Sequence, residues 1–510
     1  MQTFFNHSII KALGLFLLGS LAVLGFAPYY FFPASIISVA AILLLWHKAS
    51  THKAAFWMGF QYGLGLFGIG IYWIYISLHD FGGMPWWFAG FATFCLCAFM
   101  ALFTGIVGWL CKKLDYFIIS APILWGLADW TRSWIFTGFP WLTMGYSQVP
   151  NSPLAGFMPV IGVYGVSMVT VLLAALIALC FIHTKNHHIL RNSLVGIIVL
   201  LVSGSVLKTM EWTHPTGTPY TAALLQGNIG QEMKWSPETA QNTINQYLSM
   251  IKASDAKLIV LPETALPIIY SSLEPQAKNA LVAQAKRNHG DIIVGMIEEK
   301  SAPNPEASSD YYNSAISFNE IGTQSYRKNH LVPFGEFIPL KQVFGWIYQD
   351  WLNMPLSDLS RGGSQQNVIQ TIDKQNIGMN ICYEDVFGEE IIQQLPQATL
   401  LVNISNDAWY GESFAAEQHM QFSQARALET GRMMLRATNT GATAAIDTHG
   451  RVIAHAPNFS QTTLNVTAQH FAGSTPYVQF GNWPFIVLSF AAIFALLLRK
   501  KYIKHNVEQK

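Results

Sequence analysis

The chain has 510 residues, of which 51% are hydrophobic and only 12% are charged, and its formal net charge at pH 7 is +1. This composition is typical of a membrane protein, and a nearly neutral chain without a basic stripe argues against nucleic acid as a partner. Nearly all carboxylates lie after Lys208, and the first glutamate is Glu211. We therefore expect one part of the chain to lie in lipid and another in water.

Apolar runs that predict membrane-spanning helices dominate the first 208 residues. A helix needs about 20 apolar residues to cross the hydrocarbon layer, so the first, second, fifth and eighth runs are short for a span. We expect eight transmembrane helices: a seven-helix bundle in residues 1–208, and an eighth helix with a basic cytoplasmic tail in residues 483–510. The runs cover residues 12–26, 31–46, 54–78, 86–110, 117–130, 160–182, 189–207 and 483–498.

Basic residues between these runs predict the orientation of the bundle. Lysine and arginine near the ends of membrane helices are retained on the cytoplasmic side. Because alternate loops carry nearly all of them, we expect both termini in the cytoplasm and residues 209–482 on the periplasmic side of a bacterial inner membrane. The residues that support this orientation are Lys11, Lys48, Lys53, Lys112, Lys113, Lys185, Arg191, Arg499, Lys500, Lys501 and Lys504.

Two features inside the apolar runs have alternative interpretations. Residues 63–70 contain a G-x-G-x-x-G pattern, but no strand-to-helix turn surrounds it, so close packing of membrane helices explains it better than nucleotide binding. Asp129 and Arg132 stand one helical turn apart near the end of the fifth run. Such a pair inside the membrane would suggest transport, whereas a surface pair would be an ordinary part of an interfacial belt.

From residue 209 to residue 482, short β-rich runs alternate with helical stretches. This alternation predicts an α/β layered domain. Residues 340–356 are too apolar for an ordinary surface loop, and either a lid that dips into the membrane or a core hairpin would use them. Strands are predicted at 221–226, 257–261, 291–296, 313–318, 376–383, 399–404 and 442–447, and helices at 237–253, 275–288 and 415–430.

Cys382 is the only one of the five cysteines that lies neither within an apolar run nor at the edge of one, so it has no disulfide partner and is either reactive or buried and inert. Glu263 follows the predicted strand 257–261, and Lys328 precedes the motif at 330–336. A carboxylate base would activate a thiol that is mostly protonated at neutral pH, and a lysine beside it would favour the thiolate and hold the negative oxygen of a tetrahedral intermediate. Taken singly, Glu263 could equally be a helix-start carboxylate and Lys328 a surface cation.

Further motifs accompany these residues in order along the chain. They are Gly138-Phe139-Pro140-Trp141, Gly145-Tyr146-Ser147-Gln148, Gln226-Gly227-Asn228-Ile229 with Lys234-Trp235, residues 328–336, Cys382-Tyr383-Glu384, residues 405–411, residues 436–441 and Gly481-Asn482-Trp483-Pro484. Together they resemble the carbon–nitrogen hydrolase (nitrilase) superfamily, whose domains are αββα sandwiches with a Glu-Lys-Cys triad. Such a domain with seven spans before it and one after it resembles the family of bacterial apolipoprotein N-acyltransferases, over essentially the whole chain.

The resemblance implies that Glu263 is the general base, Lys328 the stabilising cation and Cys382 the nucleophile. The backbone N–H of Tyr383, directly after the nucleophile, would help to bind the oxyanion. No cofactor and no metal is implied.

The resemblance also implies secondary site residues. Glu336 and Glu384 match further active-site carboxylates, and Trp235 matches an aromatic residue that contacts substrate on a mobile arm. Glu384 points away from Cys382 if the strand pleat persists, which leaves a structural hydrogen-bond partner as the alternative. The arm near residues 346–357 departs from the family pattern, which leaves the acyl preference open.

The function implied by the resemblance is a two-step acyl transfer. Cys382 would take an acyl chain from a membrane glycerophospholipid, and the α-amino group of the N-terminal diacylglyceryl-cysteine of an apolipoprotein would capture the thioester. Nothing in the sequence indicates an obligate protein partner, so we expect a monomer. Two alternatives are a membrane-anchored hydrolase of amides or nitriles with the same triad, and a channel, transporter or sensor with an inactive domain. Eight spans argue against the first, and the intact triad with few buried charges argues against the second.

Overall fold

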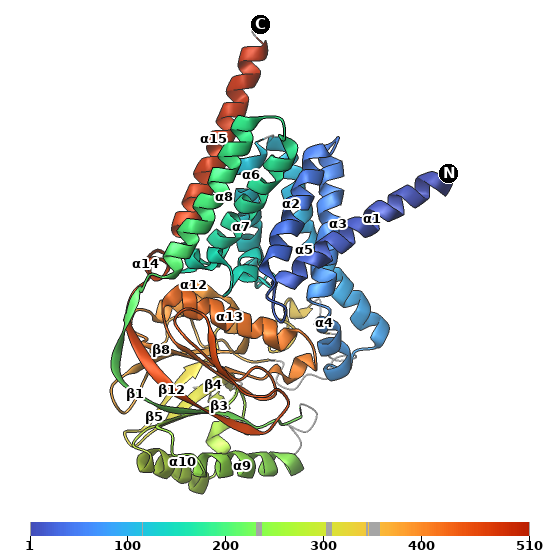
Figure 1. The fold of residues 1–510 in the computed structure, drawn as a ribbon. Helices are drawn as coiled ribbons and strands as arrows, with labels where there is room; N and C mark the ends of the chain where they lie inside the picture. The colour runs from blue at the N-terminus through green and yellow to red at the C-terminus, as the bar shows by residue number, and fades with distance from the viewer. Residues whose placement is uncertain are drawn as a thin grey trace. The chain divides into compact units, whose positions relative to one another are not determined.

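A computed structural model describes residues 2–114, 116–230, 237–301, 309–342, 345 and 358–508. The chain forms two compact units (Figure 1). The helical unit consists of Met1–Tyr72, Gly90–Met210 and Gln479–Lys510, and the sandwich unit consists of Trp73–Ala89 and Glu211–Val478. A short segment from between the predicted membrane helices therefore belongs to the sandwich unit, which the sequence analysis did not anticipate.

The helical unit is built almost entirely of helices, as expected where long apolar runs must satisfy their backbone groups internally. The first turn of its helix α5 belongs to the sandwich unit. The helices are α1 (Gln2–Ala22), α2 (Phe32–Lys48), α3 (His52–Gly70), α5 (Trp86–Leu114), α6 (Phe117–Arg132), α7 (Met158–Ile182), α8 (His187–Lys208) and α15 (Trp483–Glu508), with 3-10 turns at Val23–Gly25, Met144–Gln148 and Pro153–Phe157.

The lengths of these helices confirm only part of the expected number of membrane spans. Within the described residues, four helices are long and apolar enough to cross a bilayer, and a fifth is added if one pair bent by 52° is a single broken span. Eight spans are therefore not confirmed. The first two runs lie in apolar helical stretches, Ile9–Gly25 and Phe32–Lys48, that are shorter than a span, α6 has only 16 residues, and the third run bends. The four helices are Trp86–Leu114, Pro153–Ile182, His187–Lys208 and Trp483–Tyr502, and the bent pair is His52–Gly70 with Trp73–Phe81.

Small residues allow close helix packing in the helical unit. A Cβ atom added at Gly63 would collide with the side chain of Thr104 on α5, and one at Gly65 would collide with the carbonyl oxygen of Phe16 on α1. These contacts support the interpretation of the glycine pattern at 63–70 as a helix-packing surface.

Asp129 and Arg132 form a buried ion pair, with Nη2 of Arg132 2.6 Å from Oδ1 of Asp129. Arg132 also donates from Nη1 to the carbonyl of Trp141 at 2.9 Å, and the backbone N–H of Met144 donates to Asp129 at 3.0 Å. The surface-pair interpretation is therefore wrong. Both side chains hold the loop after α6 against that helix, which gives the pair a structural role.

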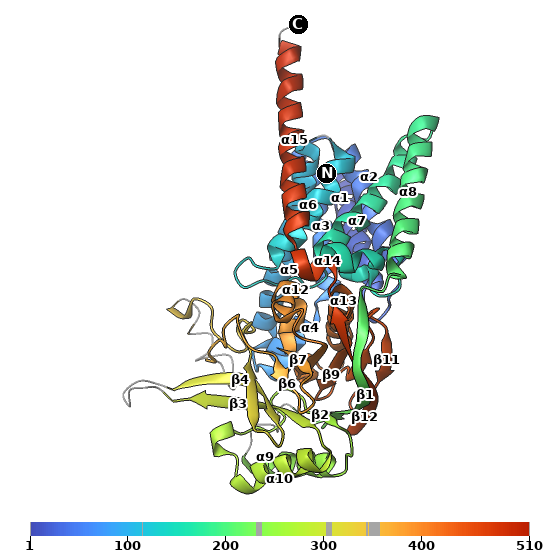
Figure 2. The same ribbon diagram turned by 90° about the vertical axis from the view of Figure 1, so that its left-hand side faces the viewer.

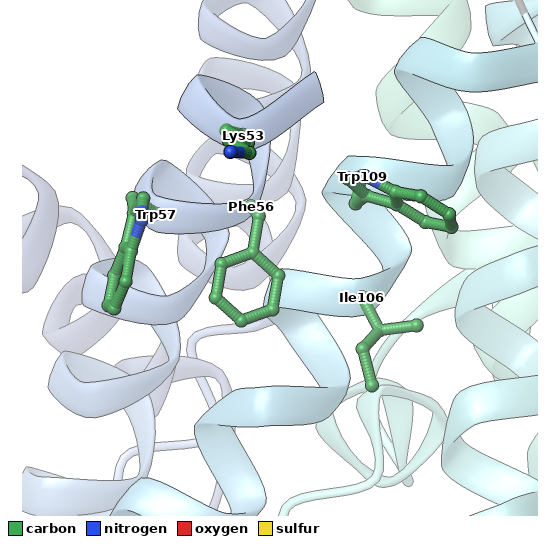
Figure 3. Close-up of a pocket in the computed structure, with 5 residues that line it drawn as sticks. All are labelled: Lys53, Phe56, Trp57, Ile106 and Trp109. Atoms are coloured by element: carbon green, nitrogen blue, oxygen red, sulfur yellow. The ribbon is translucent and has the colours of Figure 1, made fainter. Parts of the chain in front are cut away.

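An open groove of about 290 Å³ lies between α3 and α5 on the helical unit (Figure 3). Its lining is aromatic and aliphatic with a single cation, and it contains no nucleophile or carboxylate. The groove therefore lacks the groups that acyl-transfer chemistry requires. The lining residues are Lys53, Phe56, Trp57, Ile106 and Trp109.

Two six-stranded sheets form the sandwich unit (Figure 2). The strands are β1 (Thr213–Gln226), β2 (Leu258–Val260), β3 (Asp291–Lys300), β4 (Asp310–Phe318), β5 (Thr323–Arg327), β6 (Ile369–Gln370), β7 (Asn376–Ile381), β8 (Leu400–Ser405), β9 (Met434–Thr438), β10 (Ala444–Ile446), β11 (Val452–His455) and β12 (Thr462–Gly473). The first sheet has the order β12-β1-β2-β3-β4-β5 and the second β11-β10-β9-β8-β7-β6. Strands β1 to β3 are mutually parallel, as are β7 to β9, and the other pairings are antiparallel.

Helices cover the outer face of each sheet and produce four layers. Helices α9 (Pro237–Lys252) and α10 (Pro275–Arg287) pack apolar residues such as Tyr247 and Leu281 onto the first sheet. Helices α12 (Gly388–Ile391) and α13 (Ala415–Thr430) do the same on the second sheet. Strands of the two sheets contact each other, β1 with β9 and β4 with β7. The layers thus follow the expected order of helix, sheet, sheet and helix.

Candidate active site

Cys382 lies directly after β7, a strand whose last five residues are buried and which runs parallel to β8. Its φ angle is 52°, in the left-handed region. Non-glycine residues seldom adopt this conformation, and such strained residues gather at functional sites. The chain then enters a 3-10 turn, Cys382–Val386, so the strand expected at 376–383 ends two residues early. This turn places the thiol at the carboxyl end of β7.

Lys328 stands at the centre of a buried charge cluster in the first sheet. Its Nζ lies 3.2 Å from Oε1 of Glu263 and 2.9 Å from Oε2 of Glu336. Lys328 follows β5 directly and Glu263 comes three residues after β2, so the fold brings together residues that are far apart in sequence. Glu263, Lys328 and Glu336 are called the lysine cluster below.

The electrostatics of the lysine cluster explain how a lysine stays charged in a buried place. Burial alone lowers the pKa of Lys328, but the carboxylates Glu263 and Glu336 outweigh it and raise that pKa well above its ordinary value. The side chain is therefore an ammonium ion that cannot act as a base near neutral pH.

The charges of Glu263 and Lys328 act on the thiol of Cys382. Burial, and secondly the charge of Glu263, raise the pKa of the thiol, while Lys328 opposes the rise without reversing it. Lys328 therefore lowers the pKa of the thiol, as expected, but this effect is smaller than the rise caused by burial and Glu263. The resting residue is a protonated thiol, so its attack on a carbonyl requires a base that removes the proton as the bond forms.

Asn313 fixes the carboxylates of the lysine cluster, a role that the sequence analysis missed. Its Nδ2 donates to Oε1 of Glu263 at 2.7 Å and to Oε1 of Glu336 at 2.9 Å. The backbone N–H of Asn406 donates to the other oxygen of Glu263 at 2.9 Å. A buried amide within the predicted strand 313–318 was the only available signal. These bonds hold the carboxylate of Glu263 in one orientation.

Tyr383 and Glu336 are both held by contacts with neighbouring residues. Tyr383 is buried, and its ring packs edge-on against the ring of Phe387 at 5.2 Å. Glu336 accepts a hydrogen bond from the backbone N–H of Val332 at 2.9 Å in addition to its contact with Lys328. The ammonium group of Lys328 is thus shared between two fixed carboxylates.

Glu384 is held by backbone groups rather than aimed at an open site. It accepts hydrogen bonds from the N–H groups of Ile381 at 2.7 Å and Asn329 at 2.6 Å, and from the hydroxyl of Tyr326 at 3.1 Å. Burial raises the pKa of Glu384 to about 7, although the backbone donors lower it. The strand pleat does not continue to Glu384, because β7 ends at Ile381. The contacts of Glu384 nevertheless favour a role as a structural hydrogen-bond partner.

Trp235 and the arm at residues 346–357 lie outside the described residues. Their expected roles stay predictions.

The segment Trp73–Phe81 contributes a contact to the sandwich unit that the predicted single span at 54–78 does not allow for. Nε1 of Trp73 donates to the side-chain oxygen of Gln418 at 3.3 Å, and the Ser77 hydroxyl donates to the carbonyl of Trp409 at 2.8 Å. These bonds attach the segment to α13 and to the turn after β8, next to the candidate site.

Comparisons with known proteins agree with this architecture. Residues 18–176 match the model of the apolipoprotein N-acyltransferase N-terminal domain, and residues 221–477 match that of carbon-nitrogen hydrolase. The apolipoprotein N-acyltransferase of Nitrosomonas europaea is 49% identical over 499 residues, which cover 96% of this chain and 97% of that protein. That of Chromobacterium violaceum is 40% identical over 498 residues, which cover 96% and 94%. The chain therefore belongs to the apolipoprotein N-acyltransferase family and carries a carbon–nitrogen hydrolase domain.

Proposed function

We propose that this protein transfers a fatty acyl chain from a membrane glycerophospholipid to the α-amino group of the N-terminal diacylglyceryl-cysteine of apolipoproteins, through a thioester on Cys382. One observation carries the mechanism: a buried ammonium group, Lys328, is fixed between two carboxylates, Glu263 and Glu336, and the charges of Lys328 and Glu263 act on the buried thiol of Cys382. Family membership supports the reaction class.

In the first step, Glu263 removes the thiol proton while the sulfur of Cys382 attacks the ester carbonyl carbon of the phospholipid. The carbonyl oxygen becomes an oxyanion, which the Lys328 ammonium and the Tyr383 N–H stabilise. When the intermediate collapses, the bond to the glycerol oxygen breaks and that oxygen takes the proton from Glu263. Lysophospholipid leaves, and Cys382 holds the acyl chain as a thioester.

In the second step, the amine of the lipoprotein attacks the thioester carbon. Glu263 accepts a proton from the attacking nitrogen, and the same two donors stabilise the second oxyanion. The carbon–sulfur bond then breaks, and the proton returns to Cys382. An amide is formed and the free thiol is regenerated.

The helical unit has a physical purpose in this reaction. Both substrates carry acyl chains, and withdrawing these chains into water would cost ~0.8 kcal/mol per CH₂ group. We place the catalytic domain, residues 209–482, on the periplasmic side of a bacterial inner membrane, between a seven-helix bundle and an eighth helix that follows the domain. In that arrangement short helices such as α2 and α6 complete the eight spans, and the protein acts as a monomer.

Secondary residues have lesser roles in the proposal. Glu336 holds Lys328 in place and shares its charge, and Trp235 contacts the substrate. Glu384 anchors the turn that carries the nucleophile through its bonds to Ile381 and Asn329.

Mass spectrometry of the purified full chain in phospholipid micelles tests the proposal. We expect an acyl adduct on Cys382, none in Cys382→Ala, and an unchanged adduct in the control Cys180→Ala, which removes a cysteine of the helical unit. A diacylated lipopeptide should discharge the adduct and gain an amide-linked acyl chain. Absence of the adduct in the wild type would refute the thioester mechanism. Rapid discharge by water alone would favour a hydrolase.

A further inference from the structure

A second cluster of buried charged side chains adjoins Cys382 and has no part in the steps above. It comprises Asp385, Asp407, His419 and Arg436, each at most 2% exposed, and is called the arginine cluster below. Arg436 joins its carboxyl groups, with Nη2 3.1 Å from Oδ2 of Asp407 and Nη1 3.4 Å from Oδ2 of Asp385. The cluster connects β9 with α13 and with the turns after β7 and β8.

The hydrogen bonds of His419 fix its protonation state. Nε2 lies 3.0 Å from the carbonyl oxygen of Cys382, and Nδ1 lies 3.1 Å from Oδ1 of Asp407. A carbonyl oxygen can only accept a hydrogen bond, and so can an ionised carboxylate. Both ring nitrogens must therefore donate, which makes the side chain an imidazolium ion.

Asp407 is ionised for reasons that do not depend on His419 alone. Both of its oxygens lie within 3.3 Å of Nη2 of Arg436, and the hydroxyl of Ser405 donates to Oδ1 at 2.8 Å. Burial alone raises the pKa of Asp407, but Arg436 and His419 outweigh it and hold that pKa well below its ordinary value. The carboxylate therefore has no proton to offer to the imidazole ring.

The carbonyl that His419 contacts belongs to the same peptide unit as the N–H of Tyr383. A peptide unit is planar, and in its trans form the C=O and N–H bonds point in opposite directions. The amide of Asn403 contacts the same carbonyl at 3.4 Å. Donors that hold the Cys382 carbonyl on one side therefore aim the Tyr383 N–H to the other side. A charged donor also polarises the amide and makes its N–H a stronger donor.

We propose that His419, as an imidazolium ion, is a positioning residue that orients and polarises the Tyr383 N–H so that it binds the oxyanion of the acyl-transfer reaction. This inference rests on the proposed function and deepens it. The strained φ of 52° at Cys382 fits the same role, because the carbonyl contact holds a conformation that a cysteine seldom adopts.

The test compares two reactions of the same thiol in the full-length protein. Acylation by phospholipid passes through an oxyanion, whereas alkylation by iodoacetamide is a direct displacement at carbon and forms none. Mass spectrometry measures the rate of each at Cys382. In His419→Phe we expect acylation to fall about 10²–10³-fold, the usual effect of losing an oxyanion donor, with half-saturation by phospholipid unchanged. Alkylation should stay within about threefold of the wild type, because no oxyanion needs a donor.

His419→Gln keeps a neutral donor and serves as the conservative variant. It should lose only about tenfold in acylation, because orientation is retained while the charge is lost. His470→Gln is the matched control: His470 is also buried and bonds to Tyr220 and Thr399 in the same unit, so its acylation rate should match that of the wild type.

The outcomes separate this inference from the proposed function. If either His419 variant loses acylation and alkylation equally, His419 acts on the thiol itself and not on the oxyanion donor. That result would overturn the inference. Undiminished acylation in His419→Gln and His419→Phe would also overturn it. If His419→Phe does not fold, the two rates in His419→Gln decide. A wild-type protein without an adduct would instead refute the proposed function itself.

Discussion

The lysine cluster and the arginine cluster both adjoin Cys382, but their charges balance differently. In the lysine cluster, one ammonium group faces two carboxylates, which leaves negative charge available to accept a proton. In the arginine cluster, two cations face two carboxyl groups. The contrast suggests that unbalanced buried charge performs the chemistry, whereas balanced buried charge holds the backbone that the chemistry uses.

The largest expected effect is a loss of folding stability when the arginine cluster loses its arginine. Arg436→Met removes the cation that Asp407 and Asp385 share, and breaking a buried ion pair in this way costs about 3–5 kcal/mol. Thermal unfolding of the detergent-solubilised protein, followed by tryptophan fluorescence, should show a clearly lower midpoint. Arg432→Met is the matched control, because Arg432 is equally buried but donates to the carbonyls of Ala398 and Gly473. Its cost should be about 1–3 kcal/mol. Equal costs would mean that charge balance is not what Arg436 provides.

The second effect is on chemistry and depends on pH. Glu263→Gln removes the proposed base, and we expect acylation at pH 7 to fall about 10²–10³-fold. The variant must then react through thiolate that is already formed. Burial, the largest cause of the raised pKa of Cys382, persists, so thiolate is scarce at pH 7 and grows as pH rises. The rate should therefore increase about tenfold per pH unit from pH 7 to pH 9, whereas the wild-type rate changes little. A flat profile for the variant would argue against Glu263 as the base.

A smaller effect tests the excess negative charge of the lysine cluster. Glu336→Gln leaves Lys328 and Glu263 as a balanced pair, so Lys328 holds Glu263 more firmly and makes it a weaker base. We expect acylation to fall about tenfold, within the range of a general-base effect. The thermal midpoint should fall only slightly, because the shape of the side chain and one of its two acceptor oxygens remain, while one donor, the amide of Asn313 or the backbone N–H of Val332, loses its acceptor. A much lower midpoint with unchanged acylation would assign Glu336 to stability alone.

The smallest effect concerns the segment that joins the sandwich unit from between the membrane helices. Ser77→Ala removes one hydrogen bond to the carbonyl of Trp409, and such a bond contributes about 1 kcal/mol. Limited proteolysis should cut near residues 82–85 faster in this variant than in the wild type. Ser203→Ala, which removes a bond from Ser203 to Val199 within α8, is the control and should not change the rate at that site.

The strand and helix pattern of the sandwich unit was predictable where local periodicity was strong. Each of the seven predicted strands overlaps an observed one, and the predicted helix 415–430 has the bounds of α13. Strands β5, β6, β9, β11 and β12 were not predicted. Several of these are short, and β11 and β12 are partly exposed, so their residues do not form a continuous apolar run. Their pairing depends on neighbouring strands that are distant in sequence.

Some residues of the candidate site were also predictable from the sequence, and others were not. The sequence showed Glu263 after a predicted strand, Cys382 at the end of another, and Lys328 before a motif. The contacts of Asn313 and His419 were not, because an amide inside a strand and a histidine inside a helix have many ordinary explanations. Only the geometry shows which acceptor each one faces.

Side-chain chemistry and short periodic patterns were enough to predict an apolar helical part, an α/β part and three candidate catalytic residues in a fixed order. The tertiary structure decided the rest. It broke the third apolar run near residue 71, ended β7 at Ile381, and surrounded Lys328 and His419 with their partners. Those outcomes depend on burial and on hydrogen bonds between residues far apart in the chain, which local patterns do not encode.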